Sequence, residues 1–189
     1  MKKLLLLFIA IAFFGCNEKE EKIINIEDTT KINNVLYFKS DTTLVSGKVS
    51  MYKNDKLIYE KTYKEGKENG VRKGWYENGQ LREEGTIIER KTIGVRKAWY
   101  ENGQLKGQAM YNDGKLEGVW NGWYDNGQLK SEAPYKNGKL EGIRKDWYKN
   151  GQLRNERTYK NGELDGVWKV YLEDGQLKEE GIYKDGKKV

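Results

Sequence analysis

The chain has 189 residues, with one cysteine, one proline and no histidine, and its 35 basic and 29 acidic residues leave a formal net charge of +6. Without histidine the commonest general base and metal ligand are missing, and one cysteine excludes an intrachain disulfide and a cysteine-rich zinc site. We therefore expect no enzyme, no cofactor and no metal. Basic and acidic residues alternate along the chain, which is typical of a solvated surface and argues against a nucleic-acid partner.

Residues 1–15 have the pattern of a signal peptide. Lys2 and Lys3 precede an apolar run over 4–14, which is too short to span a bilayer as a helix. The segment that ends at Cys16 resembles the lipobox of bacterial lipoproteins, and this resemblance implies cleavage before Cys16 and acylation of that residue. An ordinary signal peptide followed by an incidental cysteine is the alternative.

The polar stretch 16–31 is rich in acidic residues and is expected to be a flexible tether. Several acyl chains on Cys16 would hold the protein on a lipid bilayer. The sequence therefore predicts a lipid-anchored protein of the bacterial cell envelope, in the outer membrane rather than the inner. Acidic residues directly after a lipidated cysteine also resemble surface-export signals, and a plain linker is the alternative.

The segment 32–45 contains the apolar run Val35-Leu36-Tyr37-Phe38 and is expected to add a capping strand to the array that follows. Residues 46–189 divide into six units of equal length. The positions that define the period of 24 residues are Trp75, Trp99, Trp123 and Trp147, with Tyr171 in the same place in the last unit. A fixed period indicates an array of small supersecondary units that neighbouring units stabilise.

Each unit contains two turn signals, as in Tyr124-Asp125-Asn126-Gly127-Gln128-Leu129 and Tyr135-Lys136-Asn137-Gly138-Lys139-Leu140. Asn-Gly and Asp-Gly tolerate the positive φ angles of a two-residue type I′ hairpin turn. Turns that alternate with strands of about ten residues predict an all-β fold. We expect an elongated, single-layer antiparallel β-meander of hairpin repeats, curved into a gutter because sheets twist.

Two-residue turns would place Tyr124 opposite Leu129 and Trp123 opposite Lys130, on different faces of the sheet. One face is predicted to be a structural, apolar stripe. Its members are Tyr76, Leu81, Tyr100, Leu105, Tyr111, Leu116, Trp120, Tyr124, Leu129, Tyr135, Leu140, Tyr148, Leu153, Tyr159, Leu164 and Trp168, and Trp120 should be flanked by Gly107 and Ala133.

The other face is predicted to carry a row of aromatic residues opposite cations. Its pairs are Trp75 with Arg82, Trp99 with Lys106, Trp123 with Lys130, Trp147 with Arg154 and Tyr171 with Lys178. Two interpretations of this row stay open. The cation stems could simply cover the rings, or the rings could form a platform that binds a ligand.

The segments Tyr111–Trp120 and Tyr159–Trp168 share the pattern Tyr-x-Asn/Asp-Gly-x-x-x-Gly-x-Trp. This pattern resembles MORN repeats, and its continuation Trp-Tyr-x-Asn-Gly-Gln-Leu-Lys is similar to the variant found in the YwqK antitoxin family. The resemblance covers most of 43–189. It implies a β-gutter of stacked hairpins and a binding or scaffolding role without catalysis.

We expect a membrane-tethered scaffold that binds a protein partner, with an antitoxin-like or immunity-like role. The alternative is a module that binds cell-envelope glycans through exposed tryptophan rows, and binding of anionic lipid headgroups is a third hypothesis. The last strand, near 181–189, is expected to leave an unpaired edge through which two copies could form a homodimer.

Overall fold

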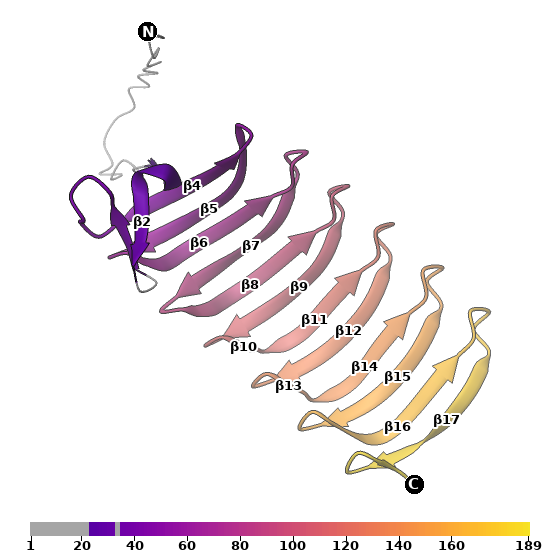
Figure 1. The fold of residues 1–189 in the computed structure, drawn as a ribbon. Coiled ribbons are helices and arrows are strands. Elements are labelled where there is room, and N and C mark those ends of the chain that lie inside the picture. The colour runs from indigo at the N-terminus through magenta and orange to yellow at the C-terminus, as the bar shows by residue number, and fades with distance from the viewer. Residues whose placement is uncertain (1–22, 33–34) are drawn as a thin grey trace, which may run out of the picture.

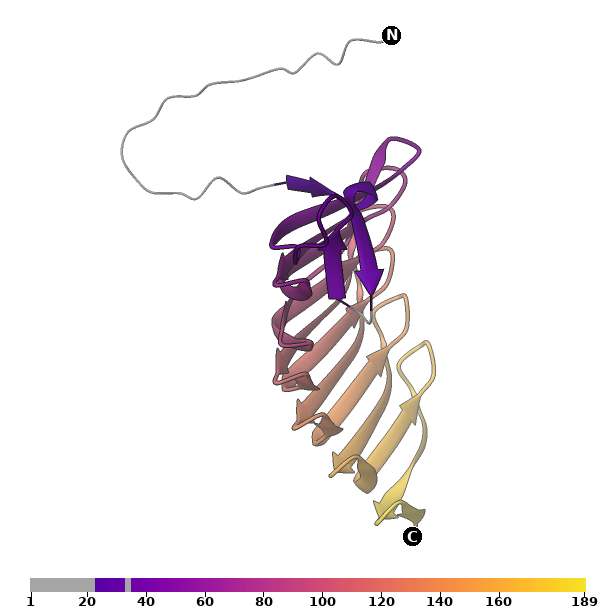
Figure 2. The same cartoon turned by 60° about the vertical axis from the view of Figure 1, so that its left-hand side comes forward.

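The computed structural model describes residues 23–32 and 35–189, which form one long sheet of 16 strands and a small sheet of two strands (Figure 1). From β4 onward, consecutive strands of the long sheet are paired antiparallel in chain order. The strands bow along their length, so the single layer is a shallow gutter (Figure 2). The predicted all-β, single-layer meander is therefore confirmed. No helix in the described ranges is long and apolar enough to cross a bilayer.

The long strands keep the period of the sequence. They are β4 (Gly47–Lys53), β5 (Lys56–Lys64), β6 (Lys67–Trp75), β7 (Leu81–Ile88), β8 (Lys91–Trp99), β9 (Leu105–Asn112), β11 (Gly118–Trp123), β12 (Leu129–Lys136), β14 (Gly142–Trp147), β15 (Leu153–Lys160), β16 (Glu163–Tyr171) and β17 (Leu177–Lys184). The two-residue strands β10 (Lys115–Leu116), β13 (Lys139–Leu140) and β18 (Lys187–Lys188) each complete a hairpin with the strand before them.

The segment before β4 differs from the sequence-based expectation. Where a tether was predicted over 16–31, the described part forms β1 (Ile23–Asn25), the 3₁₀ turn η1 (Ile26–Asp28) and β2 (Thr29–Ile32). β1 pairs parallel with β4, and β3 (Val35–Phe38) pairs with β2 in the small sheet instead of extending the long one. The reason is burial, because Ile24 packs with Leu36, Val45 and Val49 in a hydrophobic cluster.

The described residues before β4, 23–32 and 35–45, form a cap on the array. This cap also makes hydrogen bonds that a preceding repeat would otherwise make. Within the array, the Gly138 N–H donates to the Leu116 carbonyl, which belongs to the unit before it. The corresponding Gly66 N–H donates to the Val45 carbonyl at 2.7 Å, and the Gly66 carbonyl accepts from the Leu36 N–H at 2.8 Å. The cap therefore provides the hydrogen-bond partners of Gly66 in the turn after β5.

The turns that follow β5, β7, β9, β12, β15 and β17 agree with the prediction. At Asn137-Gly138 both residues have positive φ, 52° and 82°, and Tyr135 lies opposite Leu140. This is the type I′ geometry, and the same pairing joins Tyr111 to Leu116 and Tyr159 to Leu164.

The other set of turns lies at strand reversals as predicted, but the predicted two-residue type is wrong. At Asp125-Asn126-Gly127 only the glycine has positive φ, 86°, and its N–H donates to the Tyr124 carbonyl at 3.0 Å. This is a three-residue loop, a type I turn followed by a glycine bulge. The Asn126 side chain favours it, because its Oδ1 accepts from the Gln128 N–H at 3.1 Å.

The longer loop moves the register by one residue next to the turn. Trp123 therefore lies opposite Leu129, and a β-bulge between Gly122 and Trp123 restores the predicted register from Gly122 onward. The same bulge recurs in the other units, so the predicted pairs of Tyr with Leu and of Trp with Lys or Arg at these turns do not form. The observed pairs are Trp75 with Leu81, Trp99 with Leu105, Trp147 with Leu153 and Tyr171 with Leu177.

Side chains at these turns link each unit to the next. The Tyr124 hydroxyl donates to the Trp147 carbonyl at 2.7 Å, and Asn126 Nδ2 donates to the Lys149 carbonyl at 3.2 Å. The tyrosine bond recurs from Tyr76, Tyr100 and Tyr148, and the asparagine bond from Asn78, Asn102 and Asn150. These bonds explain why Tyr and Asn recur at these positions, and the last unit, which has no following unit in this sequence to bond, has Leu172 and Asp174 instead.

The array itself has little fully buried apolar surface. Apart from the cap cluster, the buried apolar residues among those described are Ala109 and Ala133. On the face opposite the groove described below, a row of β-branched side chains stays about half exposed: Val71, Val95, Val119, Ile143 and Val167. The predicted Tyr and Leu stripe is largely half-buried, since one layer of sheet has nothing to cover it.

We predict that Asn126→Ala lowers the free energy of unfolding by about 1–2 kcal/mol, because two hydrogen bonds are lost. Asn126→Asp keeps the acceptor for the Gln128 N–H and loses only the donor to Lys149, as Asp174 does naturally at its own turn. It should cost about half as much. Urea unfolding followed by circular dichroism measures the free energy of unfolding of both variants. Equal losses for Asn126→Ala and Asn126→Asp would contradict a stabilising role for the bond between the Gln128 N–H and Asn126 Oδ1.

Candidate functional site

The groove face of the sheet contains two parallel rows of side chains that run across the strands. The floor row follows the pairing Gly74, Glu83, Ala98, Gly107, Gly122, Ser131, Asp146 and Asn155. The wall row alternates large and small residues in the pairs Arg72 with Gly85, Arg96 with Ala109, Trp120 with Ala133 and Trp168 with Gly181. In these four pairs the large side chain comes from one strand of the hairpin and the small one from the next, whereas the equivalent pair of β14 and β15 is Arg144 with Arg157.

Three small residues in succession leave the middle of the floor row empty. Ala98 lies opposite Gly107, and Gly107 lies opposite Gly122 on the next strand. The result is a depression of about 570 Å³ over β8, β9 and β11, and Ala109 and Tyr111 also line it. The sheet is therefore hollowed where its own side chains stop filling the gutter.

Trp120 forms one wall of this depression. Its indole lies over Gly122, where an added Cβ would sit only 2.6 Å from Cη2 of the ring. The predicted neighbour Ala133 is confirmed, while Gly107 lies opposite Gly122 rather than Trp120. The absence of a side chain at Gly122 thus leaves the space that the far edge of the indole occupies.

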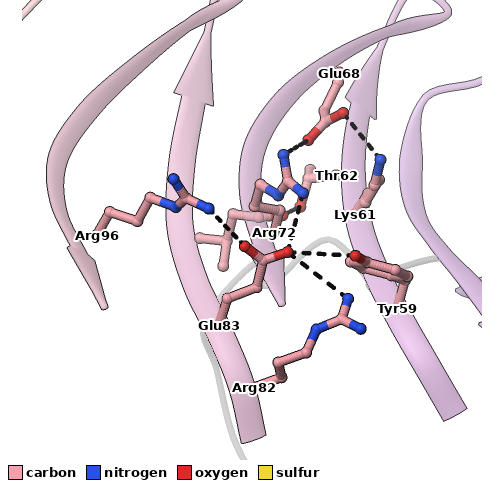
Figure 3. A network of polar contacts seen from close by, with 9 residues as sticks. Tyr59, Lys61, Thr62, Glu68, Arg72, Arg82, Glu83 and Arg96 are labelled. Carbon is pink, nitrogen blue, oxygen red and sulfur yellow. Dashed lines mark hydrogen bonds and ion pairs between the residues drawn. The ribbon is translucent and has the colours of Figure 1, made fainter. Parts of the chain in front are cut away.

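The opposite wall is a polar network centred on Glu83 (Figure 3). Its carboxylate accepts from Arg96 Nη2 at 2.7 Å and from Arg72 Nη2 at 3.2 Å, and the Tyr59 hydroxyl donates to it at 3.4 Å. Arg82 Nη2 lies 3.9 Å away. Three guanidinium groups therefore surround one carboxylate.

This network shifts the pKa values of Glu83 and Arg96. Burial alone would raise the pKa of Glu83, but the hydrogen bond from Arg96 and the charges of Arg72, Arg96 and Arg82 outweigh it, so the pKa is lowered. The hydrogen bond to Glu83 in turn raises the pKa of Arg96. Both shifts favour the charged forms of Glu83 and Arg96, and the three guanidinium groups around one carboxylate leave an excess of positive charge.

Two lysines stand at the rim of the depression. Lys106 Nζ lies 5.4 Å from the centroid of the Tyr100 ring, and Lys130 Nζ lies 5.4 Å from that of Tyr124. Arg82 similarly lies over Tyr59, at 4.7 Å. The predicted contacts of these cations with the tryptophans are therefore wrong, because the β-bulge turns them toward the tyrosines on the groove face.

The remaining predicted binding residues lie apart from the depression or at its margin. Trp75, Trp147 and Tyr171 are half-buried beside the leucines that they pair with, and Arg154 and Lys178 are exposed in later units. Trp99 and Trp123 also line the depression. Cys16, the predicted lipidation site, lies outside the described residues.

Five residues that line the depression are not among the predicted binding residues: Glu83, Arg96, Ala98, Gly107 and Ala109, of which Gly107 is predicted only as a small neighbour of Trp120. A signal for two of them exists in the repeat itself. The position of Glu83 and Gly107 holds serine, asparagine and glutamate in later units, as Ser131, Asn155 and Glu179. Positions that vary within an otherwise strict repeat are the ones that structure does not fix.

The arrangement offers groups that can bind a ligand. Among the described residues, no cluster of three or more His, Cys, Asp or Glu side chains could hold a metal ion. The site offers a hollow, aromatic rings and two cations, Lys106 and Lys130, that have no ion pair within the described part of the chain.

Comparison with protein families agrees with this architecture. The model of the MORN repeat variant matches residues 68–88, 93–113, 116–137, 140–161 and 164–185, which is more than half of the chain. The chain belongs to the MORN repeat variant family. Five MORN units are matched, and the unit 46–69 lies almost entirely outside them. Its strands β4 and β5 also form a hairpin, but their turn is the two-residue Asn54-Asp55, with both residues at positive φ, where the matched units have three-residue loops. No curated protein matches the chain.

We predict a pH-dependent role for Glu83 in stability of the MORN array. Because its pKa is lowered on folding, its contribution is present above its ordinary pKa of 4.5 and is lost as the pH falls through the lower folded value. Glu83→Gln should cost about 2 kcal/mol at pH 7 and much less near pH 3, as charge-assisted hydrogen bonds contribute about that much.

Glu179→Gln is the matched control, since Glu179 holds the same repeat position but is half exposed and pairs only with Lys188 among the described residues. It should change stability little at either pH. Thermal unfolding across the pH range measures both variants, and a cost of Glu83→Gln that is independent of pH would contradict the prediction.

Proposed function

We propose that this MORN repeat protein is a non-catalytic, membrane-tethered scaffold that binds another protein through its groove face. The single observation that supports this most is the depression between Trp120 and the Glu83 network. It combines aromatic rings, a small-residue floor and cations, which are features enriched where proteins bind one another. An array linked unit to unit presents such a surface in one preformed geometry.

The proposed tether is lipid on Cys16, which would place the array in the bacterial cell envelope. Residues 17–22 separate that residue from β1, which is the first described strand. An envelope address combined with the resemblance to the YwqK antitoxin family favours immunity against a toxin that arrives from outside over neutralisation of a toxin in the cytosol.

The glycan-binding alternative gains little from the tryptophan rows. Sugar rings stack on exposed faces of aromatic side chains, but Trp75, Trp99, Trp123 and Trp147 are only partly exposed and lie opposite leucines. More of the observed features therefore support protein binding than support glycan binding.

We predict that Cys16→Ser moves the protein from the membrane fraction to the soluble envelope fraction, because the thiol that would carry the lipid is gone. Fractionation followed by immunoblotting measures this, with unchanged thermal unfolding of the array as the control. Retention of Cys16→Ser in the membrane fraction would refute the lipid anchor.

We further predict that crosslinking in intact cells recovers one defined protein partner with the wild-type chain. The Cys16→Ser variant is the control for address, and it should recover less of that partner because it is no longer held at the membrane. Recovery of lipid or glycan alone, or of no reproducible partner, would overturn the scaffold proposal.

A further inference from the structure

We infer that the depression over β8, β9 and β11 binds an acidic peptide segment of a protein partner. One large apolar side chain of the segment would enter the depression between Arg96 and Trp120, and carboxylates on either side of it would meet Lys106 and Lys130. This inference rests on the proposed function, and it assigns that function to one place on the array and to one kind of ligand.

The floor explains why the entering group is apolar. Ala98, Gly107 and Ala109 present no side-chain hydrogen-bonding group. An added Cβ on Gly107 would meet only the Asn121 carbonyl oxygen, at 3.6 Å, so there is room for a group above it. The hydroxyls of a sugar would lose hydrogen bonds to water there without replacement, which is costly.

The hydroxyls at the rim do not change this preference. Those of Tyr76 and Tyr100 already donate to the carbonyls of Trp99 and Trp123, at 2.8 Å each. The ring of Tyr100 is also approached by Lys106. The aromatic groups near the depression therefore offer apolar contact more than polar recognition.

The charge of the site explains why the flanking groups are acidic. Glu83 is the only acidic residue among those described that line the depression, and its carboxylate is matched by Arg72, Arg82 and Arg96. Within the described part of the chain, Lys106 and Lys130 have no carboxylate within ion-pair distance. The rim is therefore electropositive, and a carboxylate is the group that complements it.

The spacing of the two lysines favours a peptide over a single compact anion. Lys106 is on β9 and Lys130 is on β12, with β11 between them. Two strand separations of about 4.8 Å place their backbones about 10 Å apart. Each lysine lies over a different ring, Lys106 over Tyr100 and Lys130 over Tyr124, so two carboxylates on either side of a central residue match this arrangement better than one phosphate does.

The test is selection from a phage-displayed library of random 12-residue peptides on the full chain in a neutral detergent. We expect enriched peptides to contain a large apolar residue with Asp or Glu on both sides. Binding of a synthesised enriched peptide, followed by fluorescence anisotropy, should weaken severalfold as salt rises, because exposed charges are screened. No enrichment, or enrichment without acidic residues, would overturn the inference.

Variants locate the binding. Gly107→Leu fills the depression, and Gly107 lies outside the left-handed φ region, so the strand should tolerate the change. It should weaken binding by about tenfold or more, as loss of an anchoring contact does. The double variant Lys106→Glu with Lys130→Glu should do the same. Lys178→Glu, at the same repeat position but away from the depression, is the matched control and should leave binding within about twofold.

The two lysines are exposed, so their variants test the inference even if Gly107→Leu fails to fold. Peptide binding that all variants retain would place the site elsewhere. The cellular crosslink separates this failure from failure of the scaffold proposal. A partner that Gly107→Leu still recovers in full would leave the scaffold standing and remove the groove assignment, whereas no partner for the wild type would remove the scaffold itself.

Discussion

The structure depends on hydrogen bonds that run from each unit to the next. A single layer of sheet cannot bury a large core, and the fully buried apolar cluster lies in the cap, around Ile24 and Val45. Along the array, the tyrosine hydroxyl and the asparagine amide of each three-residue turn reach carbonyls of the following turn, 23 residues on in the chain. At the other edge, glycine N–H groups of the type I′ turns reach carbonyls of the preceding unit. Stability is therefore distributed along both edges, as expected for a one-dimensional array.

This distribution frees the middle of each strand. Because the turns hold the units together, the floor row can change residue from unit to unit without loss of the fold. It holds Glu83 at one end, small residues at Ala98, Gly107 and Gly122, and buried polar residues from Ser131 to Asn155. These residue changes along the floor row make one part of the gutter different from the rest. A partner that binds one place on the array must recognise positions at which the units differ.

The sequence predicted the fold because its signals are local and repeated. The period, the type I′ turns such as Asn137-Gly138 and the all-β meander all follow from residues that are close in the chain. The Asn126-Gly127 turns were misassigned, since the same dipeptide also suits a three-residue loop when the asparagine side chain caps it. That difference of one residue turned Lys130 from the tryptophan to the tyrosine. The depression could not be predicted, because it depends on neighbours such as Gly107 and Gly122 that only the observed register brings together.

The two walls of the depression are also unlike each other for a physical reason. The Trp120 ring lies over Gly122, which has no side chain in its way, so this wall is fixed by packing. Arg96 is held by a hydrogen bond to Glu83, so that wall is fixed by charge. Repulsion among Arg72, Arg82 and Arg96 would spread these side chains if the carboxylate were absent. Glu83 therefore sets the shape of the site while it cancels only part of its positive charge, and a groove built in this way discriminates partners by charge as well as by fit.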